Sequence, residues 1–232
     1  MKFLILILSL VVSGTVFADK GPVLVDSKFS KSYVPIGFDS NDQVQFVAEG
    51  VFSNGCYRKG PVAITVNQET KQIKLSPQSY MYLGACIQVL VKYSKVIDVG
   101  VLSPGTYSIV QGKDNDVIGT LPVKPNTVEG ADDFLYAPIN QAMLTRNGED
   151  VTLILTGTFT NSCLSLGDVI VTPQEDVVVV QPTVKISGSA ECVNGSFHFK
   201  YEKVIEEEIS QGRYLLHVRS MNGKAVNNLV EL

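Results

Sequence analysis

Hydrophobic and polar residues alternate in short runs along most of the chain, and each run ends at a turn signal. The β-rich runs Gln45–Phe52 and Asp150–Phe159 lead into Asn-Gly and Asn-Ser turns. Ala63–Val66 and Gln72–Leu75 flank the polar connection Asn67–Lys71, which is the pattern of a β-hairpin. The period-two alternation predicts strands and not helices.

The second half of the chain repeats this arrangement. Val169–Val171 and Val177–Val180 flank Pro173–Asp176 as another hairpin, and further strands are expected at Cys86–Tyr93 and Ser196–Tyr201. About six or seven short strands per hundred residues, separated by turns, predict an all-β fold of antiparallel β-sandwiches.

One strand departs from the alternation. Gln72–Leu75 has one polar and one apolar face, whereas Val177–Val180 is apolar on both faces. We therefore expect the outer side of Val177–Val180 to be covered by a neighbouring domain, a second chain or a ligand.

An internal duplication organises the chain, because Gly50–Cys56 (GVFSNGC) recurs as Gly157–Cys163 (GTFTNSC). Three further blocks recur in the same order: Tyr33–Ile36 with Tyr136–Ile139, Lys92–Asp98 with Lys200–Glu206, and Leu102–Tyr107 with Ile209–Tyr214. The repeat predicts two tandem domains, 19–125 and 126–232, preceded by a signal peptide at 1–18. The linker around Pro122–Asp133 contains two prolines, so we expect it to be semi-rigid and the protein to be an elongated rod.

The four cysteines follow the same repeat. Four cysteines allow three pairings, and their spacing alone does not choose among them. Since each copy folded as a unit before it was duplicated, we predict the disulfides Cys56–Cys86 and Cys163–Cys192. A zinc site needs closely spaced pairs such as C-x-x-C, and the sequence has none. We expect no metal and no cofactor.

The N-terminus has the three parts of a secretory signal peptide: Lys2, the apolar run Phe3–Val12, and small residues at Val16 and Ala18. An uncleaved anchor is the alternative. Export into an oxidising compartment agrees with disulfides. We expect a periplasmic or secreted, bacterial protein that does not remain inserted in a membrane after cleavage, although Asn194–Ser196 would accept a glycan in a eukaryotic host.

The repeated Leu/Ile-x-x-Gly-x-Tyr block, which ends at Tyr107 and Tyr214, resembles the segment that enters a late strand in immunoglobulin-like and fibronectin-type domains. The resemblance implies that each tyrosine ring lies in the core and that its hydroxyl bonds back to the backbone. Together with G-x-F-x-N-x-C, the block also resembles tandem modules of bacterial exported proteins. Unlike antibody domains, the chain has no Trp and no cysteine two residues after the tyrosine.

Composition and motifs exclude several function classes. The chain has a net charge of −4 and no Lys/Arg cluster, which argues against nucleic-acid binding. It lacks G-x-S-x-G, H-E-x-x-H and a phosphate-binding glycine loop, so we predict no catalytic residues and no enzyme. His198 and His217 are interpreted as surface or packing residues, and His217 is expected to face solvent. Glu206–Glu208 is expected to be a solvated strand end and Asp114–Asp116 a turn.

The repeated Lys-Tyr-x-Lys-Val-Ile-acid block carries surface-type residues as well as core residues. It is either a structural constraint or an interaction face used twice, whose candidate residues are Lys92, Tyr93, Lys95, Lys200, Tyr201 and Lys203. We expect a non-catalytic exported protein that acts as a protein-interaction or structural spacer module, with another envelope or extracellular protein as partner. The alternatives are an inhibitor or chaperone-like protein that uses a loop or strand edge, and a carbohydrate-binding or small-ligand-binding protein.

Overall fold

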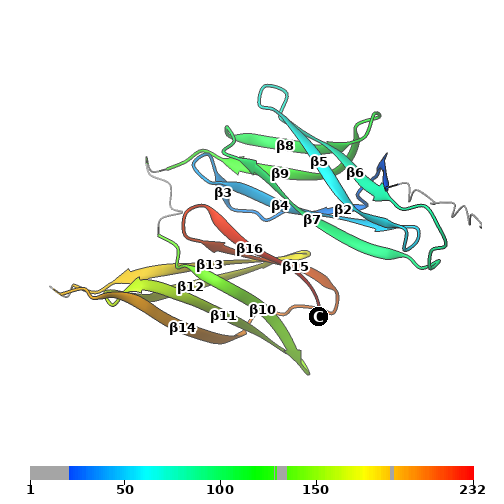
Figure 1. Cartoon of the computed structure of the whole chain (residues 1–232). Coiled ribbons are helices and arrows are strands. Elements are labelled where there is room, and N and C mark those ends of the chain that lie inside the picture. The colour runs from blue at the N-terminus through cyan, green and yellow to red at the C-terminus, as the bar shows by residue number, and fades with distance from the viewer. Residues whose placement is uncertain (1–20, 128, 130–134, 189–190) are drawn as a thin grey trace, which may run out of the picture.

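The chain is an all-β protein of two sandwiches (Figure 1). The computed structural model describes residues 21–127, 129, 135–188 and 191–232, which form sixteen strands. Within this part of the chain, no helix is long and apolar enough to cross a membrane. The expected signal peptide, residues 1–18, lies outside the described residues.

The first domain contains two sheets. One has the order β1-β6-β8-β9-β3, with β5 paired to the other side of β6, and the second has the order β2-β4-β7. The strands are β1 (Val23–Asp26), β2 (Lys31–Tyr33), β3 (Phe38–Asp39), β4 (Val44–Phe52), β5 (Tyr57–Asn67), β6 (Gln72–Met81), β7 (Val91–Gly100), β8 (Gly105–Gln111) and β9 (Asp116–Lys124).

The second domain also contains two sheets, of order β10-β11-β14 and β12-β13-β15-β16. Its strands are β10 (Ile139–Asn147), β11 (Asp150–Asn161), β12 (Leu164–Gln174), β13 (Val177–Ile186), β14 (Asn194–Ile205), β15 (Arg213–Ser220) and β16 (Lys224–Glu231). The hairpins predicted at Asn67–Lys71 and Pro173–Asp176 are confirmed as β5–β6 and β12–β13.

The two domains pair corresponding strands in the same order, and each contains a parallel pair at the centre of its larger sheet. Ile73 of β6 lies opposite Ile109 of β8, and Val178 of β13 lies opposite Leu216 of β15. The expectation of purely antiparallel sheets is wrong at these pairs and at the short parallel pair β3–β9. A parallel pair needs a crossover connection, which β7 and β14 provide by crossing to the opposite sheet. Immunoglobulin domains have antiparallel sheets, so this order differs from theirs.

Each sandwich has its own apolar core between its sheets. Tyr107 is fully buried and its hydroxyl donates a hydrogen bond to the Ser103 carbonyl at 3.1 Å. This is the geometry that the resemblance implied. Tyr214 is buried as well, but its hydroxyl lies 2.9 Å from the side-chain oxygen of Ser210 and not from a backbone group.

One disulfide joins Cys56 to Cys86 and another joins Cys163 to Cys192, with Cα–Cα distances of 5.4 and 5.3 Å. Each disulfide lies within its own domain. The disulfides indicate an oxidising, exported environment. The strand expected from Cys86 onward begins only at Val91, and the preceding residues form an irregular loop. The reason is local: besides the disulfide, the Gly55 amide donates to the Ile87 carbonyl at 2.9 Å, which holds this segment away from the sheet.

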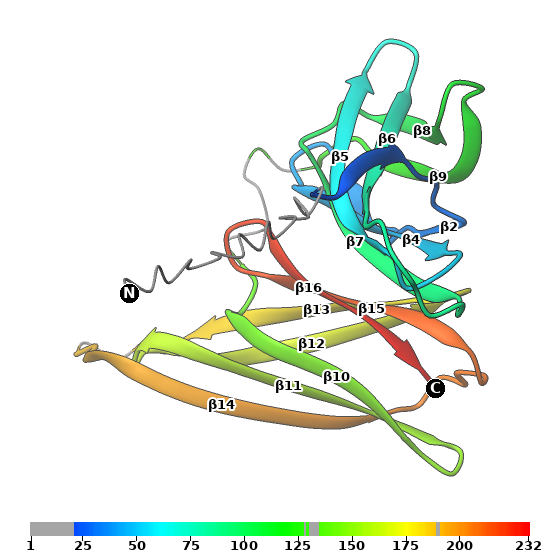
Figure 2. The ribbon, with the colours of Figure 1, turned by 45° about the vertical axis from the view of Figure 1, so that its right-hand side comes forward.

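The two domains pack against one another through sheet faces, so the expectation of an elongated rod is wrong. The sheet β2-β4-β7 of the first domain faces the sheet β12-β13-β15-β16 of the second (Figure 2). The predicted linker starts later than expected, because Pro122–Lys124 belong to β9. Residues 128 and 130–134 of that linker lie outside the described residues. The apolar outer face of β13 explains the packing, since it needs to be covered.

Candidate binding cleft at the domain junction

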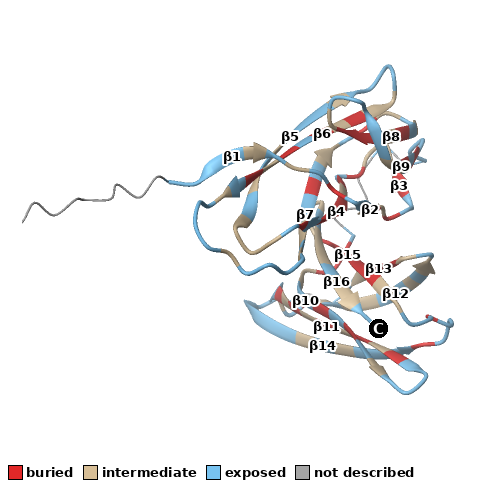
Figure 3. Ribbon diagram, turned by 90° about the vertical axis from the view of Figure 1, so that its right-hand side faces the viewer, coloured by how far each residue is buried: buried red, intermediate tan, exposed pale blue. Residues whose placement is uncertain are grey.

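An apolar contact joins the two domains. It contains Tyr33 and Val47 from the first domain and Val177, Val179, Leu215 and the partly buried Leu229 from the second. Val178 and Val180 instead face the core of the second sandwich, so the start of β13, Val177–Val180, is buried on both faces (Figure 3). The neighbouring domain is therefore the cover that the sequence predicted over Val177–Val180.

A buried ion pair lies at one end of this contact. Arg219 Nη1 is 3.0 Å from Asp42 Oδ2, and the two side chains are 6% and 3% exposed. Arg219 Nη2 donates to the Gly37 carbonyl at 2.7 Å, and the guanidinium lies 4.9 Å above the Phe38 ring. A charge in such a site is stable only when it is paired and hydrogen-bonded, so Arg219 and Asp42 depend on each other.

His217 lies beside this pair, and the expectation that it faces solvent is wrong. Its side chain points out of its own sheet but into the domain junction, where it is 1% exposed and edge-on to Phe38 at 5.7 Å. His217 Nδ1 is 2.7 Å from Asn227 Oδ1. Burial lowers the pKa of His217 to about 4, and the nearby charge of Arg219 acts in the same direction. The imidazole is therefore neutral near pH 7.

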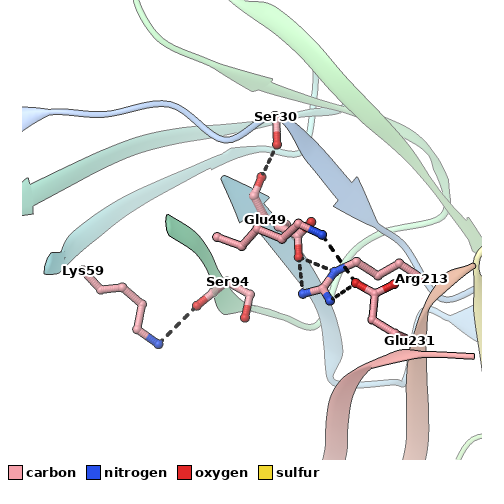
Figure 4. Close-up of polar contacts among 7 residues, drawn as sticks. Ser30, Glu49, Lys59, Ser94, Arg213 and Glu231 are labelled. Atoms are coloured by element: carbon pink, nitrogen blue, oxygen red, sulfur yellow. Dashed lines mark hydrogen bonds and ion pairs between the residues drawn. The ribbon is translucent and has the colours of Figure 1, made fainter. Parts of the chain in front are cut away.

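A more exposed charge network lies at the other end of the contact (Figure 4). Arg213 of β15 donates from Nε and Nη2 to Glu49 Oε2 at 2.7 and 2.6 Å, and from Nη1 to Glu231 at 2.7 Å. Lys92 of β7 is 3.4 Å from the same Glu231 oxygen. Burial acts to lower the pKa of Arg213, but the hydrogen bonds to Glu49 and Glu231 outweigh it and raise that pKa. The hydrogen bond from Arg213 lowers the pKa of Glu231. Both groups are thus charged near neutral pH.

A cleft of about 410 Å³ opens beside this network. Its lining residues are Phe52, Tyr57, Arg58, Lys59, Val91, Lys92, Tyr93, Ser94 and Arg213. Three rings form one wall: Phe52 stacks on Tyr93 at 3.9 Å and on Tyr57 at 5.6 Å. Arg213 comes from the second domain, so the cleft is complete only when the domains are packed together.

Gly50 positions the Tyr93 ring in this wall. The two residues lie opposite each other on β4 and β7, and a methyl group on Gly50 would be 2.5 Å from the ring. The Tyr93 hydroxyl donates to the Lys28 carbonyl at 2.8 Å, and burial raises its pKa. The hydroxyl is therefore protonated and fixed, and it has a structural role.

The structure separates the two copies of the predicted interaction face. Lys92 and Tyr93 line the cleft, and Lys95 lies beside it in a small cavity with Lys59 and Tyr93. Lys200, Tyr201 and Lys203 lie on β14, which forms the far edge of the second domain (Figure 2). Tyr93 and Tyr201 both pack against the cores of their sandwiches. The six residues do not form one face.

Three cations at the cleft were not singled out from the sequence: Arg58, Lys59 and Arg213. Two of them could have been found by comparing the two halves of the sequence. Gly60 and Gly167 occupy matching bulges in β5 and β12, which aligns the residues before them. Immediately before these glycines the first copy has Arg58 and Lys59, and the second has Ser165 and Leu166. Arg58 and Lys59 are thus cleft cations that the second half of the chain lacks, whereas Lys92 recurs there as Lys200.

An exposed apolar loop adjoins the cleft. It runs from Tyr82 to Leu90 and contains Leu83, Ile87 and Leu90, which are 60%, 74% and 77% exposed. Cys86, within the loop, is tied to Cys56. Both ends of the loop meet cleft residues, because Tyr57 pairs with Met81 and Val91 follows Leu90.

The remaining sequence features lie elsewhere. His198 is exposed and 2.9 Å from Thr158. Glu206–Glu208 is exposed beyond the end of β14, and Asp114–Asp116 lies at the turn between β8 and β9. Among the described residues there is no group of three or more His, Cys, Asp or Glu that could hold a metal ion.

Comparison with known proteins identifies one region. Residues 46–123 match the family model of the ORF11 beta-sandwich domain. The match runs from β4 to β9 and therefore includes all the residues of the first domain that line the cleft. It agrees with the sandwich fold of that domain. No curated protein and no solved structure shows significant similarity to the chain.

Proposed function

We propose that this is an exported, non-catalytic binding protein whose first domain docks an acidic partner protein on the loop Tyr82–Leu90. We also propose that the domains arose by duplication of one module. The duplication is supported by the four repeated sequence blocks and by the shared strand order with its parallel central pair. The disulfides and the N-terminal sequence pattern support export.

The exposure of the loop is the observation that carries the binding proposal. Large contiguous apolar surfaces are uncommon on soluble monomers and mark interaction sites. On the strand β1, Val23 pairs with Met81, the residue before the loop, and is 46% exposed. The disulfide holds the loop in shape, so a partner orders little of it on binding.

The surroundings of the loop favour an acidic protein as the partner. Arg58, Lys59 and Lys92 lie beside the two ends of the loop. A protein segment with apolar side chains flanked by carboxylates matches this surface in both polarity and charge. The corresponding segment of the second copy, residues 187–193, reads SGSAECV, so the scaffold itself does not require an apolar loop.

The test is affinity capture with the oxidised protein from its own envelope and secreted fractions. The loop variant carries Leu83→Ser, Ile87→Ser and Leu90→Ser. The control variant carries Val117→Ser, Met143→Ser and Ile170→Ser, which replace comparably exposed apolar residues elsewhere. We expect a protein that the wild type and the control capture and the loop variant does not.

The captured protein is then purified and its dissociation constant measured against all three baits. We expect the loop variant to bind at least about tenfold more weakly, as for loss of a central apolar anchor. Equal affinity of the loop variant and the wild type, or capture of no protein by the wild type, would overturn the proposal.

A further inference from the structure

We propose that the cleft at the domain junction is an oxyanion site, which binds a carboxylate or phosphate group through Arg58 and Lys59. The cleft adjoins the apolar loop, and Arg58 and Lys59 lie beside both, but binding of a small anion in the cleft does not require the partner protein. Its volume of about 410 Å³ lies within the range of small-molecule pockets.

The charge balance of the cleft favours an anion. Four cations line it: Arg58, Lys59, Lys92 and Arg213. Glu49 and Glu231 both pair with Arg213, and Glu231 also pairs with Lys92. Arg58 and Lys59 have no carboxylate within salt-bridge distance among the described residues. The cleft therefore has two positive charges without a protein counter-ion.

The hydrogen bonds of these cations leave donors available. Arg58 uses Nη1 for the backbone carbonyls of Gly55 and Tyr57, at 2.9 and 2.8 Å. These bonds fix the guanidinium, and its remaining N–H groups match the planar fork of a carboxylate or phosphate. Lys59 Nζ is 3.4 Å from the Ser94 carbonyl, and an ammonium group has three donors. Figure 4 shows Ser94 between the Lys59 amine and the Arg213 guanidinium.

The aromatic wall suggests that the anionic group is carried by an organic ligand. Phe52 is almost completely buried within the stack, whereas Tyr57 and Tyr93 are partly exposed. A ring or short chain bearing the oxyanion would pack on this wall while the charge lies against Arg58 and Lys59. An acidic saccharide and a phosphate-bearing molecule share this chemistry.

The second domain supplies the reference for the test. At its matching positions it has Ser165 and Leu166, before the same glycine and bulge. The variant Arg58→Ser, Lys59→Leu therefore introduces residues that this scaffold already holds in strand β12. The control Lys200→Gln, Lys203→Gln removes the same amount of charge from β14, which is remote from the cleft.

The experiment is an amide NMR titration of the oxidised full chain with galacturonate, with its neutral counterpart galactose and with inorganic phosphate. We expect galacturonate, phosphate or both to shift the resonances of cleft residues, and galactose to shift none. Binding of galacturonate assigns a carboxylate ligand, and binding of phosphate alone assigns a phosphate ligand. In the Arg58→Ser, Lys59→Leu variant the dissociation constant should rise about tenfold or more, with no change in the β14 control.

Three results would each overturn the proposal: no shift of cleft resonances with either anion, unchanged binding in the Arg58→Ser, Lys59→Leu variant, or equal weakening in the β14 control. The last result would mean that general charge and not the cleft attracts the anion. The loop variant Leu83→Ser, Ile87→Ser, Leu90→Ser retains the cleft cations and should bind the anion normally. Failure of partner capture and failure of the oxyanion site are thereby distinguished.

Discussion

Arg219 of the second domain lies 3.0 Å from Asp42 of the first, and both side chains are almost completely shielded from solvent. The pair connects residues that are far apart in the sequence and lies beside the apolar contact between the domains. It is the more deeply buried of two ion pairs that link the domains, the other being Arg213 with Glu49.

Replacement of Asp42 by Ala should destabilise the protein by about 3–5 kcal/mol, because it leaves the Arg219 guanidinium buried without its carboxylate. Urea unfolding measures the effect. The matched control is Asp116→Ala, which breaks the exposed pair with Lys28 and should cost about 0–1 kcal/mol. Equal losses in the two variants would contradict a special role for the buried pair.

Acidification should weaken the protein through His217. The pKa of this residue is lowered from 6.5 to about 4 in the folded state, so the unfolded chain takes up its proton first as the pH falls. The stabilisation is fully present above about pH 6.5 and is lost on descent to about pH 4, with a total of about 3 kcal/mol.

Urea unfolding at several pH values between 7 and 4 tests the His217 prediction. The His217→Gln variant should lose this part of the pH dependence, whereas His198→Gln, at an exposed site, should retain it. A wild type and a His217→Gln variant with the same slope would show that other groups cause the acid sensitivity.

Gly50→Ala should displace the Tyr93 ring, because the added methyl group would lie 2.5 Å from it. We expect a loss of about 1–3 kcal/mol, as for other overpacked sites, measured from the urea midpoint. Gly188→Ala has no heavy atom within 4 Å of the added methyl group and should be nearly neutral. A stable Gly50→Ala protein would mean that the aromatic wall adapts freely.

Removal of either disulfide by Cys→Ser replacement of both partners should cost about 3.5 kcal/mol in the chain-entropy model, since the closed loops have nearly equal length. The two variants should differ in binding. Loss of Cys56–Cys86 releases the loop Tyr82–Leu90 and should weaken partner capture, whereas loss of Cys163–Cys192 should not. Equal effects of the two variants on capture would show that the Cys56–Cys86 disulfide does not hold the loop in its binding conformation.

Much of the fold could be predicted because it depends on local patterns and on the repeat. Alternation located the β5–β6 and β12–β13 hairpins, and the repeat selected the cysteine pairs found in the structure. The parallel pairs β6–β8 and β13–β15 were not predictable in this way, because strand order depends on long-range packing that no local pattern encodes. The strand expected at Cys86 failed for a different reason: its apolar residues satisfy the strand pattern but lie in a loop.

The candidate site was predicted only in part. Tyr93 was identified because it recurs as Tyr201. Both tyrosines pack against the core of their sandwich, so the recurrence reflects packing and not a binding role. The charges of Arg58 and Lys59 appear only in the first copy, so a search for shared residues passed over them. Alternation correctly placed His217 on the outer face of its sheet. The expectation of solvent exposure was wrong because the first domain covers that face.

The contact between the domains joins two unlike surfaces, a three-stranded face of the first and a four-stranded face of the second. Such a head-to-tail contact does not close on itself, and repeated between molecules it generates fibres. The corresponding six-stranded sheet of the first domain has Gln72 and Lys74 where the second domain has Val177 and Val179. Lys74 therefore places a charge where the second domain has an apolar contact residue, so only the sheet β12-β13-β15-β16 has the apolar outer face that joins the domains.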